Sequence, residues 1–352
     1  MKLPDLKKAG LIKEKAKRIL IAAYGFEQRS LGWSEYQMRQ GKILDEALII
    51  KYEPGKGKNK ISELRNGLSK IGIDYPKEII FNVFESESLE KVLELQFKDI
   101  NNYEEVIIDI TAMTKYLILV CLHKLAHFKG SLRIIYTEAQ DYSPSFKEYE
   151  QYRLDSSLVA HFPSQGFKKI LRAKCLSSIR MQGQPVALVA FASFNEQLVR
   201  YMLGTISPYR LVFINGSPPR TDYEWREKAT QFIHRRLIDD YRIDNQIDNK
   251  TGLLKRKAST LLYTETIQAI NEIYDQFGMY ERIIIAATGS KMQTVGLFFS
   301  KILHPDIHIE YPNPDSYYFD GMSKGVREIH EIIFLEFSDL INEIKPERKF
   351  IT

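Results

Sequence analysis

The sequence has little of what several large classes of protein require. Its two cysteines, Cys121 and Cys175, lie far apart without metal-site spacing, so neither a disulfide framework nor a zinc site is expected. No apolar run approaches the roughly 18 residues that span a bilayer. The lysine-rich N-terminus also lacks the apolar core of a secretory signal. These absences predict a protein of the cytoplasm with no membrane partner.

The common nucleotide-binding and catalytic motifs are missing as well. The chain has no G-x-G-x-x-G for a dinucleotide cofactor, no P-loop and no G-x-S-x-G elbow of a serine hydrolase. We therefore expect no cofactor and no metal, and no catalytic residue is assigned. The formal net charge is +5, from 50 basic and 45 acidic residues. A chain-wide nucleic-acid binder is usually more basic, so direct DNA binding is not expected.

What the sequence does contain is a copy of itself. Residues 19–30 read ILIAAYGFEQRS and residues 187–198 read ALVAFASFNEQL, which places Phe194 opposite Phe26. Residues 105–115, EVIIDITAMTK, match residues 281–291, ERIIIAATGSK, and residues 133–142 match residues 308–317. The three matches occur in one order at nearly one spacing, which indicates an internal duplication.

Apolar, β-branched runs alternate with segments of helical periodicity in both halves. Continuous apolar runs are typical of parallel strands that are covered on both faces. Strands are predicted at 19–24, 46–52, 78–84, 104–110, 131–136, 186–192, 208–214, 258–263, 280–286 and 306–311. Helices are predicted at 28–41, 60–71, 88–100, 115–128, 195–206, 221–242, 266–278 and 291–303.

This alternation predicts an α/β protein of two tandem Rossmann-like parallel-sheet units related by internal duplication. The first unit is expected at 1–142 and the second at 186–324, joined by a linker at 143–185. Apolar residues between Gly325 and Ile344 predict an amphipathic closing helix, so that 325–352 would be a C-terminal helix and tail.

Candidate ligand-binding residues follow the strands, because ligands of parallel sheets bind outside the carboxyl ends of the strands. Hydroxyl residues and a lysine open the helices that begin near 115 and 291, where backbone N–H groups and the helix dipole attract anions. The predicted residues are Thr111, Thr114 and Lys115 in the first half and Thr288, Gly289, Ser290 and Lys291 in the second.

The turn after the first strand of each half is the expected second wall of the site. It carries Gly25, Glu27 and Arg29 in the first half, and Ser193 and Asn195 in the second. The third match pairs Tyr136, Glu138, Asp141 and Tyr142 with Tyr311, Asn313, Asp315 and Tyr317. These side chains would either bind a base or ribose, or complete a turn.

These motifs resemble those of the CRISPR-associated Rossmann-fold (CARF) sensor proteins. Residues 109–115, DITAMTK, are similar to that family's Asp-x-Thr-x-Gly-Thr-Lys pattern, with Met113 in place of glycine. Residues 288–292, TGSKM, keep the Thr-Gly-Ser-Lys core, although alanine stands where the acid would be. The resemblance implies second-messenger oligonucleotide binding by a sensor dimer, here fused into one chain without the usual effector domain.

The leading hypothesis is therefore a regulatory protein that senses a nucleotide or cyclic oligonucleotide between the two halves. It would be a subunit of a bacterial antiviral defence system and act through a protein effector on another chain. One alternative is a metal-independent phosphodiesterase or ring nuclease that degrades such a ligand. The other is a non-catalytic scaffold subunit whose crevice has lost its function.

Overall fold

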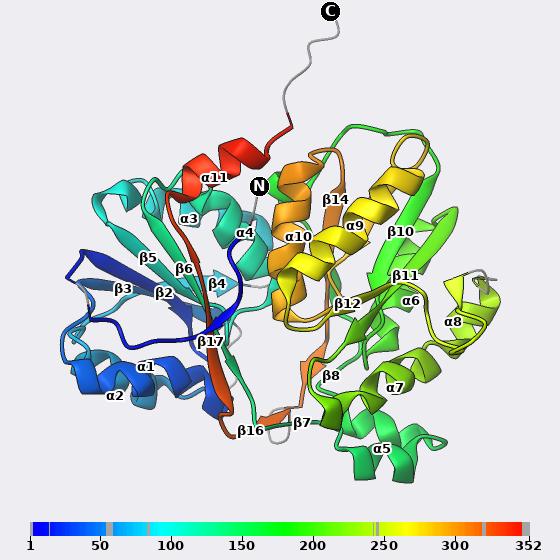
Figure 1. Cartoon of the computed structure of the whole chain (residues 1–352), viewed down its shortest axis with the longest axis horizontal. Helices are drawn as coiled ribbons and strands as arrows, with labels where there is room; N and C mark the ends of the chain where they lie inside the picture. The colour runs from blue at the N-terminus through cyan, green and yellow to red at the C-terminus, as the bar shows by residue number, and fades with distance from the viewer. Residues whose placement is uncertain are drawn as a thin grey trace, which may run out of the picture. The chain divides into compact units, whose positions relative to one another are not determined.

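The chain folds into two compact units, each built around its own β-sheet (Figure 1). The computed structural model describes residues 3–13, 15–53, 59–82, 85–241, 243, 246–318 and 322–346. Residues 1–142 and 323–352 form the first unit, and residues 143–322 form the second. The second unit is thus inserted in the first, between Tyr142 and Ser323.

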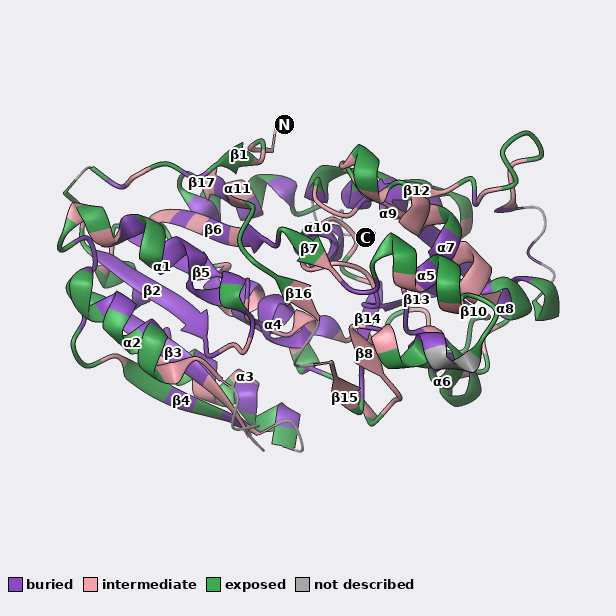
Figure 2. Cartoon of the chain, turned by 90° about the horizontal axis from the view of Figure 1, so that it is seen from below, coloured by how far each residue is buried: buried purple, intermediate pink, exposed green. Residues whose placement is uncertain are grey.

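The first unit contains a seven-stranded sheet of order β1-β17-β6-β5-β2-β3-β4. Its strands are β1 (Lys7–Lys8), β2 (Arg18–Ala23), β3 (Glu46–Glu53), β4 (Lys77–Asn82), β5 (Glu105–Asp109), β6 (Ser131–Glu138) and β17 (Glu328–Phe334). The strands from β6 to β4 are parallel, whereas β17 pairs antiparallel with β6 and β1 with β17. All six residues of β2 are buried, as expected of a strand covered on both faces (Figure 2).

Helices cover both faces of this sheet. Its α-helices are α1 (Gly32–Gln37), α2 (Ile61–Lys70), α3 (Ser86–Gln96), α4 (Lys115–Leu125) and α11 (Phe337–Ile344), with 3₁₀ turns at Gln28–Leu31, Met38–Gln40 and Ile100–Asn102. Figure 1 shows α1 and α2 on one side of the sheet and α3 and α4 on the other. On the α1–α2 side, Trp33, Leu64 and Leu68 pack against Leu20 and Ile49.

The second unit contains a six-stranded sheet of order β12-β11-β10-β13-β14-β9. Its strands are β9 (Lys169–Leu171), β10 (Val186–Phe191), β11 (Arg210–Ser217), β12 (Lys257–Ser259), β13 (Arg282–Ala286) and β14 (His308–Asn313). Its α-helices are α5 (Phe146–Tyr152), α6 (Glu196–Ile206), α7 (Trp225–Ile233), α8 (Arg235–Asp240), α9 (Tyr263–Phe277) and α10 (Lys291–Leu303), with 3₁₀ turns at Ser156–His161, Lys174–Leu176 and Thr221–Tyr223. The strands from β12 to β14 are parallel, and β9 pairs antiparallel with β14.

The two sheets share one topology. In the first unit β2 lies at the centre, with β3 and β4 on one side and β5 and β6 on the other; in the second unit the same places are taken by β10, by β11 and β12, and by β13 and β14. We refer to β2 and β10 as the first strands of the two halves and to β6 and β14 as their fifth strands. An antiparallel strand pairs with each fifth strand, β17 in the first unit and β9 in the second. The predicted fold class, two Rossmann-like α/β units, is confirmed, and the shared order is what a duplication produces.

Each unit also carries a small antiparallel pair beyond the end of its fifth strand. In the first unit β7 (Asp141–Tyr142) pairs with β16 (Ser323–Lys324), and in the second β15 (Ser316–Tyr317) pairs with β8 (Ser164–Gln165). The chain leads from β16 into β17 and from β8 into β9. The antiparallel strand of each unit is therefore introduced by the same structural element.

The closing helix predicted from Gly325 to Ile344 is wrong over its first half. Residues Glu328–Phe334 form β17, which pairs with β6 over its whole length, and only Phe337–Ile344 form a helix. The spacing of the isoleucines fits a helix and a strand equally well. Pairing with the edge of a sheet is a long-range contact that favours β-branched residues and decides between them.

The predicted linker at 143–185 belongs to the second compact unit, where it forms α5, β8 and β9. The reason is again long-range pairing, since β9 completes the edge of the sheet at β14. Residues 347–352 of the predicted tail, and the ends of two predicted elements at 83–84 and 242, lie outside the described residues. Every helix within the described ranges is too short or too polar to cross a bilayer.

Candidate functional site

Helix α4 begins at the lysine that the sequence predicts as a phosphate ligand. Thr114 is its N-cap: the Leu117 amide donates a hydrogen bond to Thr114 Oγ1 at 3.3 Å. The Thr114 amide donates to the hydroxyl of Tyr52, on β3, at 2.8 Å. The hydroxyl of Thr114 therefore defines the start of the helix, and Lys115 is its first residue.

Lys115 lies in surroundings that are unusual for a lysine. Its side chain is only partly exposed, and burial lowers the pKa of its ammonium group from 10.5 to about 8. A partly dehydrated ammonium group has lost part of its hydration energy, and a neighbouring anion would restore the stability of the charged form. This makes the start of α4 a better anion site than a capped helix with a solvated lysine.

The loop between β5 and α4 is anchored by its own polar residues. The Thr111 amide donates to Asp109 Oδ1 at 2.9 Å, and Thr111 Oγ1 accepts a hydrogen bond from the Thr137 amide on β6 at 2.9 Å. Thr111 is buried. Its observed role is to hold the loop on the end of the sheet, while Thr114 and Lys115 face outward enough to remain partly exposed.

The turn after β2 lies directly against this loop, as the sequence predicts. A Cβ on Gly25 would lie 2.8 Å from Ala112 Cβ and 2.9 Å from Ser30 Cβ, so only glycine fits this close approach. The Lys60 amide, at the start of α2, donates to the Gly25 carbonyl at 2.8 Å. The loops that follow β2, β3 and β5 therefore meet at the carboxyl edge of the first sheet.

Glu27 and Arg29, in the same turn, are bound to each other. Arg29 Nε and Nη2 donate to Glu27 Oε1 and Oε2 at 3.0 and 2.9 Å. Both residues are buried, and the guanidinium group lies over the rings of Tyr136 and Tyr142 at 5.7 and 5.5 Å. It also donates to the Thr137 carbonyl at 3.1 Å. This cluster stabilises the turn, and a direct ligand contact by Glu27 or Arg29 stays a prediction.

The second unit repeats the helix start with different partners. Ser290 caps α10 in a capping box: the Gln293 amide donates to Ser290 Oγ at 3.0 Å, and the Ser290 amide donates to Gln293 Oε1 at 2.7 Å. Ser290 Oγ also donates to the Thr260 carbonyl at 2.7 Å. Lys291 is the first residue of the helix and is partly exposed, as Lys115 is in α4.

Thr288 and Gly289 attach this loop to the end of β10. The Phe191 amide donates to Thr288 Oγ1 at 3.0 Å, and that hydroxyl donates to the Phe191 carbonyl at 2.8 Å. A Cβ on Gly289 would lie 2.3 Å from Gln293 Oε1 and 2.9 Å from Phe191 Cγ. Glycine is therefore required for the close packing of this loop.

Ser193 and Asn195 occupy the turn that follows β10. Asn195 is buried, and its Nδ2 donates to Ser164 Oγ at 3.3 Å and to the Gly166 carbonyl at 3.2 Å. Ser193 Oγ is buried without a hydrogen-bond partner among the residues that the structure describes. A ligand contact by Ser193 therefore stays a prediction, because its hydroxyl oxygen is buried in this structure.

The tyrosines of the third match form the same contact in both units. The hydroxyls of Tyr136 and Tyr142 lie 3.2 Å apart, and those of Tyr311 and Tyr317 also lie 3.2 Å apart. Each pair joins the fifth strand of its unit to the short strand that follows, β7 or β15. The tyrosines help to close this turn, and contact with a base or ribose stays a prediction.

Sequence reasoning missed the residues that face these turns, Ser164 and Ser323. Ser323 Oγ donates a short hydrogen bond to Glu27 Oε1, and Ser164 Oγ accepts from Asn195. Each serine opens a Ser-x-Gly sequence, at 164–166 and at 323–325. That repeat is the sequence signal, but its copies occur in the opposite order to the other three matches, because the copy of the second unit, at 164–166, precedes the copy of the first unit, at 323–325.

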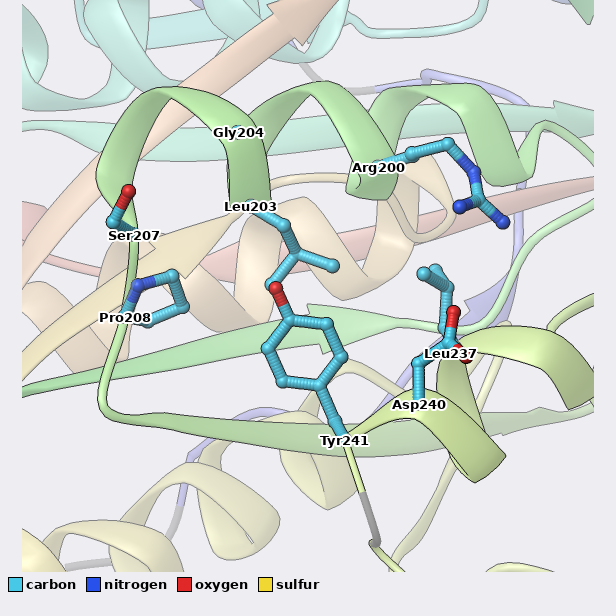
Figure 3. Close-up of a pocket in the computed structure, with 8 residues that line it drawn as sticks. All are labelled: Arg200, Leu203, Gly204, Ser207, Pro208, Leu237, Asp240 and Tyr241. Carbon is cyan, nitrogen blue, oxygen red and sulfur yellow. The ribbon is translucent and has the colours of Figure 1, made fainter.

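A separate cavity of about 530 Å³ lies in the second unit, between α6 and α8 (Figure 3). Leu203 and Tyr241 point toward each other across it. Ser207 and Pro208, which also line it, lie between α6 and the start of β11. The cavity is therefore at the amino ends of the strands and contains none of the predicted ligand-binding residues. Across the described ranges, no cluster of three or more His, Cys, Asp or Glu residues could hold a metal ion.

No protein-family model matches the chain, and no curated protein matches it in sequence. Among solved structures, it is similar to a type III CRISPR defence DNA nuclease activated by cyclic oligoadenylate. That likeness has 12% identity and a TM-score of 0.47 over 88% of this chain and 68% of the nuclease.

Two further likenesses are weaker. A putative universal stress protein from Pseudomonas aeruginosa UCBPP-PA14 has 10% identity and a TM-score of 0.24, over 85% of this chain and 94% of that protein. A UDP-GlcNAc 2-epimerase from Neisseria meningitidis, bound to UDP-GlcNAc, has 10% identity and a TM-score of 0.23, over 82% and 92%. With every TM-score below 0.5, the three likenesses carry no argument about function.

Proposed function

We propose that the chain is a regulatory protein that binds a phosphate-bearing nucleotide, with a cyclic oligonucleotide as the leading candidate. The ligand would bind at the carboxyl edges of the sheets, where α4 and α10 begin. It would act through a protein effector on another chain, in a bacterial antiviral defence system. The type III CRISPR nuclease described above is activated by a ligand of this class, but the proposal rests on the residues of this chain.

The observation that carries the proposal is the partly dehydrated Lys115 at the first position of a capped helix. An ammonium group with a pKa of about 8 gains stability when a phosphate shares its surroundings, whereas a solvated lysine gains little. The capped helix adds backbone N–H groups and the positive end of its dipole. These features favour an anion such as a phosphate group.

Recurrence at a second helix supports the same conclusion. Lys291 takes the first position of α10 behind a capping serine, and Gly289 keeps its loop close against β10. The chain therefore offers two candidate phosphate sites, one in each unit. Because Thr114 and Ser290 both serve as caps, the lysines and the backbone amides would contact the phosphates.

A thermal-shift screen tests the proposal. Cyclic oligoadenylates, linear oligoadenylates, ATP and inorganic phosphate would each be added to the full chain. A ligand that binds only the folded state stabilises it by about 2.7 kcal/mol at about 100 times its Kd. We expect a cyclic oligonucleotide to raise the Tm more than equimolar phosphate does. The proposal fails if no nucleotide raises the Tm above the phosphate control.

The same samples separate a sensor from an enzyme. Each ligand that raises the Tm would be incubated with the protein and analysed by chromatography. We expect the ligand to be recovered intact, as a sensor requires. Conversion to linear products would instead assign the protein as a phosphodiesterase or ring nuclease, with the same residues holding the ligand.

A further inference from the structure

The two Ser-x-Gly sequences occupy equivalent places in the two units. Ser323 pairs with Tyr142 across β16 and β7, and Ser164 pairs with Tyr317 across β8 and β15. The glycine two residues later has a φ of 64° at Gly325 and 65° at Gly166. This is a fourth match between the halves, and it is found in the structure as well as in the sequence.

The backbone continues in the same way after each glycine. The amide of Arg327 donates to the Glu138 carbonyl at 2.9 Å, and the amide of Lys168 donates to the Asn313 carbonyl at 2.9 Å. Both acceptors are at the ends of the fifth strands, β6 and β14. The antiparallel strands β17 and β9 therefore start from equivalent turns.

Each serine contacts the first-strand turn of its own unit at an equivalent residue. Ser323 donates to the carboxylate of Glu27, and Ser164 accepts from the amide of Asn195. Glu27 and Asn195 are 8% and 5% exposed, whereas the two serines are partly exposed, so each bond joins a buried side chain to the surface. The serine donates in the first unit and accepts in the second, but both units make a hydrogen bond between the same two positions.

The first-strand turn packs against the loop that precedes the lysine at the helix start. In the first unit this contact is Gly25 against Ala112, three residues before Lys115. A continuous set of contacts therefore runs from Ser323 through Glu27 and the turn to the start of α4. A displacement of the serine should also displace the turn, because close packing transmits such movements between groups in contact.

Ser323 also lies next to one of the two crossings of the chain between the units. Ser323 is the first residue of the first unit after the inserted second unit ends at Met322. Ser164 lies farther from a crossing, because α5 and the 3₁₀ turn at Ser156–His161 stand between it and Tyr142. The segment that completes the first sheet thus reaches it directly from a crossing, whereas the segment that completes the second does not.

We propose that Ser164 and Ser323 are positioning residues that tie each first-strand turn to the chain segment leading into the antiparallel strand of its sheet, β9 or β17. Each serine holds its turn in the conformation that places the turn beside the lysine loop. When a ligand binds at the edge, the same hydrogen bond passes the change of the turn to the segment at 323–327 or 164–168. The coupling to a ligand rests on the proposed function, whereas the positioning does not.

Hydrogen–deuterium exchange of the full chain tests the positioning without a ligand. Ser323→Ala should speed exchange in residues 24–31 about tenfold, the effect of losing one hydrogen bond to a charged group. Exchange in β3 and α9 should not change. Ser323→Thr, which keeps the hydroxyl, should restore slow exchange. The matched control is Ser338→Ala in α11, where the hydroxyl donates to its neighbour Asp339 and to no other residue within the described ranges.

Two results would overturn the positioning role. One is unchanged exchange in residues 24–31 of Ser323→Ala. The other is faster exchange spread evenly over the first unit, which would mean an ordinary loss of stability. Ser164→Ala tests the second unit in the same way, with the effect expected in residues 192–198.

A second arm adds the cyclic oligoadenylate that gives the largest thermal shift. In wild-type protein we expect slower exchange both in residues 24–31 and in residues 323–327. In Ser323→Ala, slower exchange should persist in 24–31 and be lost in 323–327. If no oligonucleotide binds, the proposed function fails while the first arm still decides the positioning role. If the ligand protects 323–327 equally in Ser323→Ala, the coupling is wrong.

Discussion

Ligand binding should be accompanied by proton uptake at Lys115. In the free protein its pKa is about 8, so about half of the molecules carry the neutral amine at pH 8. A bound phosphate favours the charged form and raises the pKa toward the ordinary value of 10.5. Binding should therefore take up about 0.5 proton at pH 8 and only about 0.1 at pH 7.

The same shift sets the pH dependence of affinity. Because the neutral amine must be protonated before it can hold the phosphate, affinity should fall as the pH rises through 8. The expected loss is about tenfold between about pH 7 and about pH 9. The stability of the free protein depends on pH in the opposite direction. Between the folded pKa and 10.5 the unfolded chain holds more protons, so the free energy of unfolding rises with pH in that range.

Isothermal titration calorimetry in two non-phosphate buffers with different enthalpies of ionisation measures the uptake directly. The ligand should be a cyclic oligonucleotide, since its phosphodiesters do not titrate near pH 8. Lys115→Met should abolish the uptake that wild type shows at pH 8. Lys91→Met, at an exposed position on α3, should leave it intact. Equal uptake in wild type and Lys115→Met would refute the reasoning.

Two predictions concern the fold around the site. Gly25→Ala forces a methyl group to 2.8 Å from Ala112 Cβ, so we expect a loss of about 1–3 kcal/mol in urea unfolding and weaker ligand binding; Gly204→Ala, whose methyl meets nothing in α6, should not destabilise the protein. Burial lowers the pKa of His234 below 6.5, so the unfolded chain takes up a proton that the folded chain excludes. The urea concentration at the unfolding midpoint should therefore decrease when the pH is lowered from about 7.5 to about 5.5, and it should decrease less in His234→Phe. The first expectation would be contradicted if Gly25→Ala unfolded at the same urea concentration as wild type. The second would be contradicted if the urea midpoint changed equally with pH in wild type and in His234→Phe.

Most of the strands and helices were predictable because local patterns determine them. The run at 19–24 is apolar throughout because β2 is covered on both faces, and it appears as Arg18–Ala23. Helix α10, predicted at 291–303, has those bounds because Ser290 caps it. Where the residues that determine an element are close to it in sequence, the element can be predicted from a single sequence.

What could not be predicted depends on partners that are distant in sequence. The isoleucines of β17 form a strand because β6, almost 200 residues earlier, offers them a sheet edge. Residues 169–171 form β9 because of β14 in the same way. No periodicity within these segments reveals such an edge, which explains both the incorrect closing helix and the incorrect linker.

The candidate site shows the same division. The meeting of the Gly25 turn with the loop before Lys115 was expected, since the carboxyl ends of parallel strands share one edge. That Glu27 and Arg29 bind each other could not be foreseen, because residue types do not reveal side-chain distances. The role of Ser323 was missed because its partner Glu27 lies 296 residues away.

The most direct test of the central claim is the equilibrium binding of a cyclic oligonucleotide to the double variant Lys115→Ala/Lys291→Ala. A charge-assisted hydrogen bond contributes about 1.5–3 kcal/mol, so losing one at a helix start should raise the Kd of that site at least about tenfold. The control, Lys91→Ala/Lys228→Ala, removes two exposed lysines from the same units and should bind like wild type. A folded double variant with the wild-type Kd would contradict the claim that the two helix starts hold the phosphates.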